Sequence, residues 1–520
     1  MAQDLDINLR LESSNCKDYF ISEHLKSNLK TRALQGASAI IIAQICTFCI
    51  GIIGTIILAR LLTPDDFGLI AMALSFSLLL QNFGVNGFTE AIIQRPEINH
   101  KQISTLFWIN ASISLGLTLF FIASSPVIAL FYKEPRLKLI ISVISLSILF
   151  AGLSTQHLAL LKRNMQFHKT SANTVGASFI SITVAITLAF WGWGYWALVA
   201  RWVMLPLLTT IGAWILCRWR PGLPARGTGV WPMLKFAINT YGNFIMDYFR
   251  RYIDKIFLGR FYGTQSLGHY DRAYQLSNML PNQLVHPMTS VAVATLSRLS
   301  DNPAKYRHNY LEVISLLAFV GMPISAILTL TGNDLILFLL GPQWVIAGKI
   351  FAIFGVSIGV MLIYFTHGWL HLSLGTPDRW FRWGVIALIV TVLCFIVGLP
   401  FGVIGIATAY STSFYILVGP GLWYAGRPIQ LKLSSIVSVV WKYYLSALAA
   451  GLLCWFIFYA HSATSYFFMG FNVLTRISIS IILCLSIYII LIIISYRSID
   501  PIFYFISILR EMIPNNSTDK

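Results

Sequence analysis

Ionisable and amide side chains recur at helical spacing in the segment 236–258, FAINTYGNFIMDYFRRYIDKIFL. Steps of four, four, three and four residues place five of them along one face of a helix. A face of this kind cannot rest against hydrocarbon, so we expect it to line water and to meet a charged ligand. The five are Asn239, Asn243, Asp247, Arg250 and Asp254, with Arg251 and Lys255 beside them.

A second reading of this face needs no ligand. Asp247 with Arg251, and Asp254 with Arg250, are spaced for ion pairs within one helix, which would hold the segment together. The face is longer than pairing alone requires, so we predict a hydrated cavity and keep intrahelical pairing as the alternative.

Polar side chains in other apolar segments fit the same cavity. We predict that they help bind an anionic group, because basic residues outnumber acidic ones in the set. The predicted substrate-binding residues are Arg250, Arg251, Lys255, Arg201, Asn243, Asn82, Asn86, His286 and Lys349, and the predicted ion-coupling residues are Glu90, Asp247 and Asp254. For any single member, a polar contact between helices is the simpler explanation.

The elements that position these residues must be membrane helices. The chain has 520 residues, of which 57% are hydrophobic and 11% charged, whereas soluble domains carry about 25% charged residues. Apolar runs of roughly 20 residues each match a bilayer about 30 Å thick. We predict an all-α polytopic membrane protein with about fourteen transmembrane helices, at 36–59, 68–92, 103–125, 139–161, 171–191, 194–217, 236–258, 276–297, 310–332, 346–373, 382–400, 403–425, 437–460 and 473–495.

The basic residues reveal the orientation. With both termini inside, the tails and inner loops hold about 25 of the 37 Lys and Arg residues, and the outer loops hold about 6. This bias is the positive-inside rule, so the net charge of +17 reflects topology and gives no support to a nucleic-acid partner. We expect a bacterial inner-membrane protein with cytoplasmic N- and C-termini and membrane lipids around it.

The chain repeats itself at an offset of 200 residues. ILARLLTPDDFGLIAMA at 57–73 and FLGRFYGTQSLGHYDRA at 257–273 share Leu58/Leu258, Arg60/Arg260, Gly68/Gly268 and Ala73/Ala273. Six predicted spans separate them, so the two copies run the same way and predict parallel six-helix lobes around a cavity. The predicted organisation is a tail at 1–35, an N-lobe at 36–217, a basic loop at 218–235, a C-lobe at 236–426, two further helices within 437–495 and a tail at 496–520. Arg60 and Arg260 are predicted packing or gate residues.

Several catalytic signatures are missing from the sequence. It has no Walker A motif, no HExxH and no GxSxG in a strand–turn–helix setting, and the longest predicted loop has about 18 residues. We therefore expect a transporter without catalytic residues, metal or cofactor, and not an enzyme. A membrane-embedded polysaccharide polymerase or ligase, the alternative of another class, needs a sizeable outer loop.

Short motifs in order along residues 35–430 carry a resemblance. They include LARLLTPDDFG at 58–68, AIIQRPEI at 91–98, GWGYWALV at 192–199, IDKIFLGRFYGTQSLGHYDRAYQL at 253–276, LGPQW at 340–344 and LGTPDRWFRW at 374–383. Together they resemble the polysaccharide transporter branch of the multidrug/oligosaccharidyl-lipid/polysaccharide (MOP) flippase superfamily, in particular Wzx-type exporters.

The resemblance implies a V-shaped, two-lobed bundle that works by alternating access. Its implied cargo is an oligosaccharide repeat unit on undecaprenyl pyrophosphate, bound by basic lumen residues that correspond here to Arg250, Arg251, Lys255 and Arg201. Polysaccharide polymerase and assembly proteins are candidate partners. Two alternatives stay open within the superfamily: a cation-coupled multidrug exporter, whose lumen would favour acidic groups, and a flippase for the peptidoglycan lipid precursor.

Overall fold

The computed structural model describes residues 29–85, 98–225, 231–460 and 470–512, with the single residues 89, 92, 466 and 468. For 29–33, 78–85, 231–247, 249–251, 286, 460 and 508–512 it describes the backbone alone. Throughout these described parts the chain is helical, without a strand. It forms two compact units, Met1–Gly268 and His269–Lys520, which are treated separately below.

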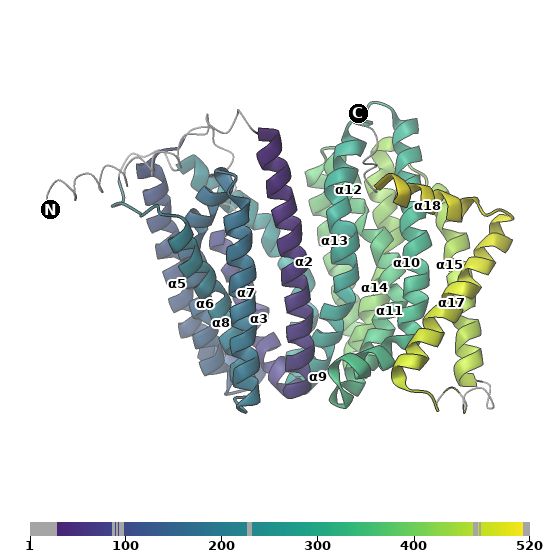
Figure 1. Cartoon of the computed structure of the whole chain (residues 1–520), viewed down its shortest axis with the longest axis horizontal. Helices are drawn as coiled ribbons and strands as arrows, with labels where there is room; N and C mark the ends of the chain where they lie inside the picture. Colours follow the sequence, from purple (N-terminus) through teal and green to yellow (C-terminus); the bar gives the residue numbers. More distant parts are fainter. Residues whose placement is uncertain are drawn as a thin grey trace. The chain divides into compact units, whose positions relative to one another are not determined.

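The first unit is built of long, nearly antiparallel helices joined by short turns (Figure 1). Short turns with polar residues interrupt the apolar sequence at Leu62–Thr63 and at Lys133–Arg136, where α2 and α5 end. Its helices are α2 (Leu29–Leu61), α3 (Pro64–Val85), α5 (His100–Tyr132), α6 (Leu137–Arg163), α7 (Phe167–Phe190), α8 (Tyr195–Leu216) and the first part of α9 (Trp231–Ser297).

The second unit begins inside α9 and adds further long helices. Near the end of the chain the short α18 lies across the ends of its neighbours and not along them (Figure 1). The elements are α10 (Pro303–Leu340), η2 (Pro342–Trp344), α11 (Val345–Phe365), α12 (His367–Ser373), α13 (Pro377–Gly398), η3 (Leu399–Phe401), α14 (Gly402–Gly426), η4 (Arg427–Ile429), α15 (Leu433–Trp455), η5 (Phe456–Ala460), α17 (Val473–Tyr496) and α18 (Asp500–Met512).

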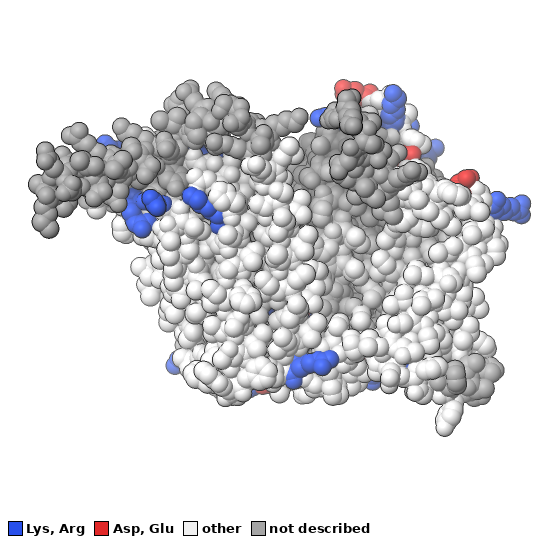
Figure 2. Space-filling model, viewed as in Figure 1, with Lys and Arg blue, Asp and Glu red and all other residues white. Residues whose placement is uncertain are grey.

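Helix length and hydropathy confirm a multi-pass membrane protein. Among the described residues, 10 helical segments are long and apolar enough to cross a bilayer, and one of them, Pro377–Ile429, contains both α13 and α14. On the face in Figure 2, the described charged side chains gather near the two ends of the helices, and the surface between those ends is almost free of them. The number of fourteen spans remains a prediction, since α3 and α9 do not meet the hydropathy criterion.

Helix α9 is two helices joined at Gly263. This glycine has φ 76° and ψ −174°, a region that only glycine enters readily. The predicted seventh and eighth spans, 236–258 and 276–297, therefore lie on either side of this break along the chain.

Several polar side chains within the spans form hydrogen bonds to neighbouring helices. In the first unit the Asn110 amide donates to Gly152 O at 2.9 Å, and the Asn173 amide donates to Thr209 O at 2.9 Å. In the second unit the Trp369 indole donates to Thr289 Oγ1 at 2.8 Å. Such bonds fix helix register in an apolar surrounding, where an unmet polar group is costly.

Candidate functional site

The start of α3 is held by a reciprocal cap. Thr63 precedes Pro64, a favoured first helical residue, and its N–H and hydroxyl both donate to Asp66 Oδ2, at 2.9 and 2.7 Å. The Asp66 N–H in turn donates to Thr63 Oγ1 at 3.3 Å. The sequence TPDD is thus a capping box with aspartate at the third position, and it fixes where α3 begins.

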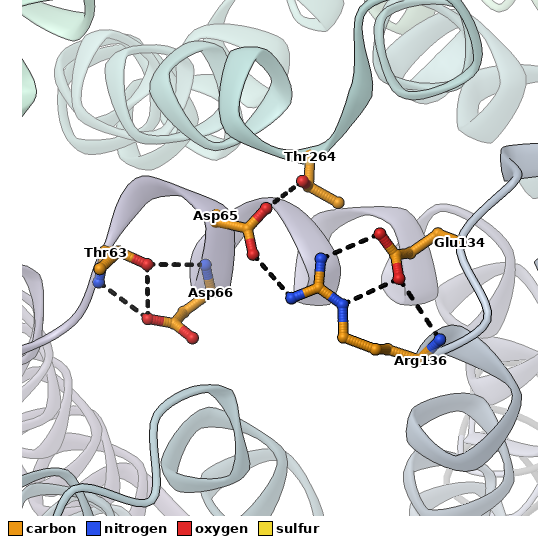
Figure 3. Close-up of polar contacts among 6 residues, drawn as sticks. All are labelled: Thr63, Asp65, Asp66, Glu134, Arg136 and Thr264. Carbon is orange, nitrogen blue, oxygen red and sulfur yellow. Dashed lines mark hydrogen bonds and ion pairs between the residues drawn. The ribbon is translucent and has the colours of Figure 1, made fainter.

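Between the two capping residues, Asp65 is directed outward to other segments (Figure 3). Its Oδ2 accepts from Arg136 Nη1 at 2.8 Å, and its Oδ1 accepts from the Thr264 hydroxyl. Arg136 also binds Glu134 through two nitrogens, at 2.8 and 2.9 Å. These four residues, called the Arg136 cluster below, join the α2–α3, α5–α6 and Gly263 turns at one end of the first unit.

The charges in the Arg136 cluster reinforce one another. The two hydrogen bonds from Arg136 hold the pKa of the Glu134 carboxyl below its usual range, and the same carboxylate raises the pKa of Arg136. Arg136 remains 41% exposed, so each pair is weaker than a buried one would be. The cluster therefore acts through its geometry, by holding three turns in one place.

Below this cluster, two helix starts cross with their backbones in contact. A Cβ on Gly68 would collide with the carbonyl oxygen of Thr264, and a Cβ on Gly268 would collide with that of Pro64. The same atom on Gly268 would lie 3.1 Å from the N of Gly68. Only glycine permits this approach, which we call the glycine crossing.

The glycine crossing obeys the internal repeat. Positions 64 and 68 correspond to 264 and 268 at the offset of 200, so each glycine meets the residue four positions before the other glycine. Four further identical residues, Leu58, Leu258, Ala73 and Ala273, are fully buried. The identical glycines therefore recur where the two copies of the repeat touch.

The predicted gate arginines lie close to these contacts. Arg260 sits over the rings of Phe131 and Phe261, at 5.8 Å from each ring centre, and is half-buried. Arg60 is exposed in the last turn of α2. Both positions precede the turns that carry the Arg136 cluster.

The first part of α9 packs a row of aromatic and charged residues into the first unit. Tyr248 donates to the carbonyl of Ser75 in α3 and stacks on Tyr252, with ring centres 4.4 Å apart. The Lys255 ammonium lies 4.8 Å from the centre of the Tyr252 ring. Asp254 and Lys255 are buried, with 2% and 5% of their surface exposed.

Asp254 and Lys255 thus bury two opposite charges within the predicted seventh span, and their roles in ion coupling and substrate binding stay predictions. The remaining described site residues lie elsewhere: Arg201 is half-buried in α8, and Lys349 is exposed in the first turns of α11. The other predicted site residues lie outside the described side chains, namely Asn82, Asn86, Glu90, Asn239, Asn243, Asp247, Arg250, Arg251 and His286.

Sequence reasoning did not assign Asp65, Asp66, Glu134 or Thr264 to a site. The capping signal in TPDD was visible, because a threonine followed by an acidic residue three positions later marks a helix start. The ion pair between Asp65 and Arg136 joins residues 71 positions apart, so a local sequence pattern cannot predict it.

At the opposite end of α5, the segment after α8 is bound along the helix start. The Trp219 indole donates to His100 Nδ1 at 3.0 Å, and Gly222 N donates to Ser104 Oγ at 3.0 Å. Trp108 returns a bond to Gly222 O at 2.9 Å. These bonds hold the segment from Trp219 to Gly222 against the start of α5.

Comparison with solved structures shows the fold. The chain is similar to the lipid II flippase MurJ in an inward closed conformation, with a TM-score of 0.69, 17% identity, and coverage of 88% of this chain and 99% of the other. It is also similar to an inward-facing multidrug resistance MATE family transporter of the MOP superfamily, with a TM-score of 0.59, 13% identity, and coverage of 74% and 94%. The predicted all-α, multi-pass membrane fold is confirmed.

Sequence comparison reaches the same group. The teichuronic acid biosynthesis protein TuaB of Bacillus subtilis is 24% identical over 87% of this chain and 94% of its own length. The lipopolysaccharide biosynthesis protein WzxC of Escherichia coli is 24% identical over 319 residues, which are 61% of this chain and 65% of WzxC. The succinoglycan transport protein ExoT of Rhizobium meliloti is 22% identical over 62% and 65%. The family model described as "Polysaccharide biosynthesis protein" matches residues 57–348, so the chain belongs to that family.

Proposed function

We propose that this protein is a flippase that carries a lipid-linked oligosaccharide repeat unit from the cytoplasmic to the periplasmic leaflet for surface polysaccharide synthesis. Two findings together support the proposal. The chain belongs to a polysaccharide biosynthesis family, and it shares the fold of a lipid II flippase over 88% of its length. A lipid-linked sugar is the cargo that fits both.

The physical problem is to move a polar head through hydrocarbon while its tail stays in lipid. Charged residues buried in a span supply a polar environment at membrane depth. Lys255 and Asp254 hold such places, and Arg250 and Arg251 precede them by one turn of α9. In this proposal the basic members bind the pyrophosphate, and Asp254, Asp247 and Glu90 exchange a coupling ion.

Alternating access requires a closure that breaks at one end. We assign this role to the glycine crossing and the Arg136 cluster, which join three turns at the end that the charge bias predicts to be periplasmic. The contacts of the Arg136 cluster are polar and lie at turns, so separating them costs less free energy than separating an interdigitated apolar core. Arg60 and Arg260 flank this gate.

The same proposal includes the location and the type of activity. The protein resides in the inner membrane with both termini cytoplasmic, and it makes or breaks no covalent bond. Polymerase and assembly proteins of the polysaccharide pathway would receive the translocated unit.

A flippase of the peptidoglycan lipid precursor is the second candidate, favoured by the fold shared with MurJ. The two functions differ in the sugar and share the lipid pyrophosphate. A multidrug exporter of cations would gain little from Lys255 at the centre of its path.

The test is a deletion of the gene in its host, followed by measurement of where the lipid-linked repeat unit accumulates. We expect build-up on the cytoplasmic face, with loss of the surface polymer and unchanged peptidoglycan, and restoration by the wild-type gene. Normal translocation of the unit, or unpolymerised units on the periplasmic face, would refute the proposal. Accumulation of the peptidoglycan precursor would favour the second candidate.

A further inference from the structure

A cavity of about 900 Å³ lies within the second unit, and none of its lining residues belongs to α9. It is walled by α10, α11, α14, α15 and α17 and by Tyr459 of η5. Its volume falls within the range of about 300 to 1,000 Å³ that is usual for ligand sites. Nothing in the proposed transport cycle uses it.

The cavity opens to the lipid side of the helices. Leu448, Leu452 and Trp455 of α15 line it and are 47%, 58% and 52% exposed. Exposed apolar residues on a membrane helix face hydrocarbon, so an occupant enters from the bilayer. Fifteen residues of α10 separate the lining residues Met322 and Leu337, which makes the cavity about 22 Å long at a rise of 1.5 Å per residue.

Three hydroxyl groups of the cavity wall already have hydrogen-bond partners in the protein, so they add little polarity to it. Ser325 donates to Gly355 O at 2.5 Å, Thr329 donates to Ser325 O at 2.7 Å, and Tyr415 donates to Val356 O at 2.8 Å. A saturated or unsaturated hydrocarbon chain fits a wall of this kind. It would bury apolar surface without displacing a polar partner.

One end of the cavity carries both signs of charge. Arg476 Nη2 lies 3.2 Å from Asp334 Oδ1, and the side chains are only 16% and 14% exposed. Both residues line the cavity, near the end of α10 and the start of α17. Together they offer a guanidinium for a phosphate and a carboxylate for an ammonium group, with no net charge.

We propose that this cavity binds one zwitterionic aminophospholipid, with an acyl chain between α10 and α15, the phosphate at Arg476 and the ammonium at Asp334. Charge complementarity favours this lipid over others. An anionic phospholipid leaves Asp334 unmatched, and a polyprenyl pyrophosphate brings several negative charges against it. The site is thus distinct from that of the transported lipid, and the proposal stands whether or not the proposed function does.

Native mass spectrometry of the purified full-length protein tests the selectivity. The detergent-solubilised chain is mixed with phosphatidylethanolamine, phosphatidylglycerol or undecaprenyl phosphate at equal concentrations. We expect one retained phosphatidylethanolamine with a preference of about tenfold over phosphatidylglycerol, equivalent to 1.4 kcal/mol. Equal retention of the lipids, or preference for undecaprenyl phosphate, overturns the proposal.

Charge variants separate lipid recognition from a merely structural ion pair. Asp334→Asn leaves Arg476 with a neutral neighbour, so we expect the preference to shift to phosphatidylglycerol, whereas Asp334→Glu keeps the wild-type order. The matched control is Asp301→Asn, in the exposed turn between α9 and α10. A loss of thermal stability in Asp334→Asn with unchanged selectivity would show that the pair only joins helices, and would refute the lipid site.

A second pair of variants tests the chain-binding part of the cavity. Leu448→Trp places a larger side chain at the rim, and we expect it to abolish retention of the lipid. Leu445→Trp is the control, because Leu445 is similarly exposed on α15, at 49%, but does not line the cavity. Equal retention by both variants would contradict the placement of the acyl chain.

Discussion

Gly68 and Gly268, two hundred residues apart, each press against the carbonyl oxygen of the residue four positions before the other. The partners are Thr264 and Pro64, so the contact is reciprocal and follows the internal repeat. Two helix starts that approach this closely form a defined contact point, which either stays closed or separates as a whole. This property makes the crossing suitable as a gate.

Substitution of either crossing glycine should have the same effect. In Gly68→Ala or Gly268→Ala, the new methyl group collides with a backbone carbonyl, which cannot move aside as a side chain would. We expect a loss of about 1–3 kcal/mol of stability, the usual cost of overpacking, measured as a lower unfolding temperature of the detergent-solubilised protein.

The control for the crossing is Gly116→Ala in α5, where a Cβ would meet nothing within 4 Å. It should unfold at or above the wild-type temperature, because alanine favours helix. An unchanged unfolding temperature in both crossing variants would show that the helix starts do not approach as described.

The cap on α3 should be separable from the crossing. Thr63→Ala removes the hydroxyl bond to Asp66 and the acceptor for the Asp66 N–H, at a cost of about 1 kcal/mol. Thr63→Ser keeps both and should behave as wild type in the same unfolding assay. Equal loss in the two variants would indicate that the threonine methyl group, and not the cap, matters.

Acid should weaken the Arg136 cluster. Because Arg136 lowers the pKa of Glu134, this carboxyl contributes stability above its ordinary value of 4.5, and the contribution disappears as the pH falls through the lowered folded value. At neutral pH we expect wild type to be more stable than Glu134→Gln by the few tenths to about 1 kcal/mol usual for exposed pairs, which is observed as a higher unfolding temperature. The difference in unfolding temperature should disappear in acid. A gap that widens below pH 4.5 would contradict this.

The charge of Lys255 should matter more than its bulk. Lys255→Met keeps a long side chain against the Tyr252 ring but removes the ammonium, so we expect export of the repeat unit to fall severalfold at equal protein level, whereas Lys255→Arg retains most of it. The readout is surface polymer per cell in the deletion host. Full export by Lys255→Met would remove this residue from the substrate path.

The fold was largely predictable because membrane helices carry their signal locally. Apolar runs predicted the spans, as seen in α5, α6 and α17, whereas the direction inferred from the basic residues stays a prediction. The repeat also led to Gly68 and Gly268, although nothing in the sequence showed that they would meet.

The Arg136 cluster escaped prediction for a physical reason. Asp65 reaches Arg136 and Thr264 only after three separate turns gather at one end of the bundle, and such pairings depend on tertiary packing. The break at Gly263 was also missed, because one glycine in a polar segment does not reveal its φ angle. The cap at Thr63, by contrast, can be predicted from the four consecutive residues TPDD at 63–66.

The most direct test locks the proposed gate and follows the cargo. In a chain whose native cysteines are replaced by serine, Asp65→Cys and Thr264→Cys place two thiols where the side chains now touch. Oxidation should stop the repeat unit from reaching the periplasmic leaflet, and reduction should restore it, while Asp65→Cys alone is insensitive to oxidant. Undiminished translocation by the fully cross-linked protein would contradict the account.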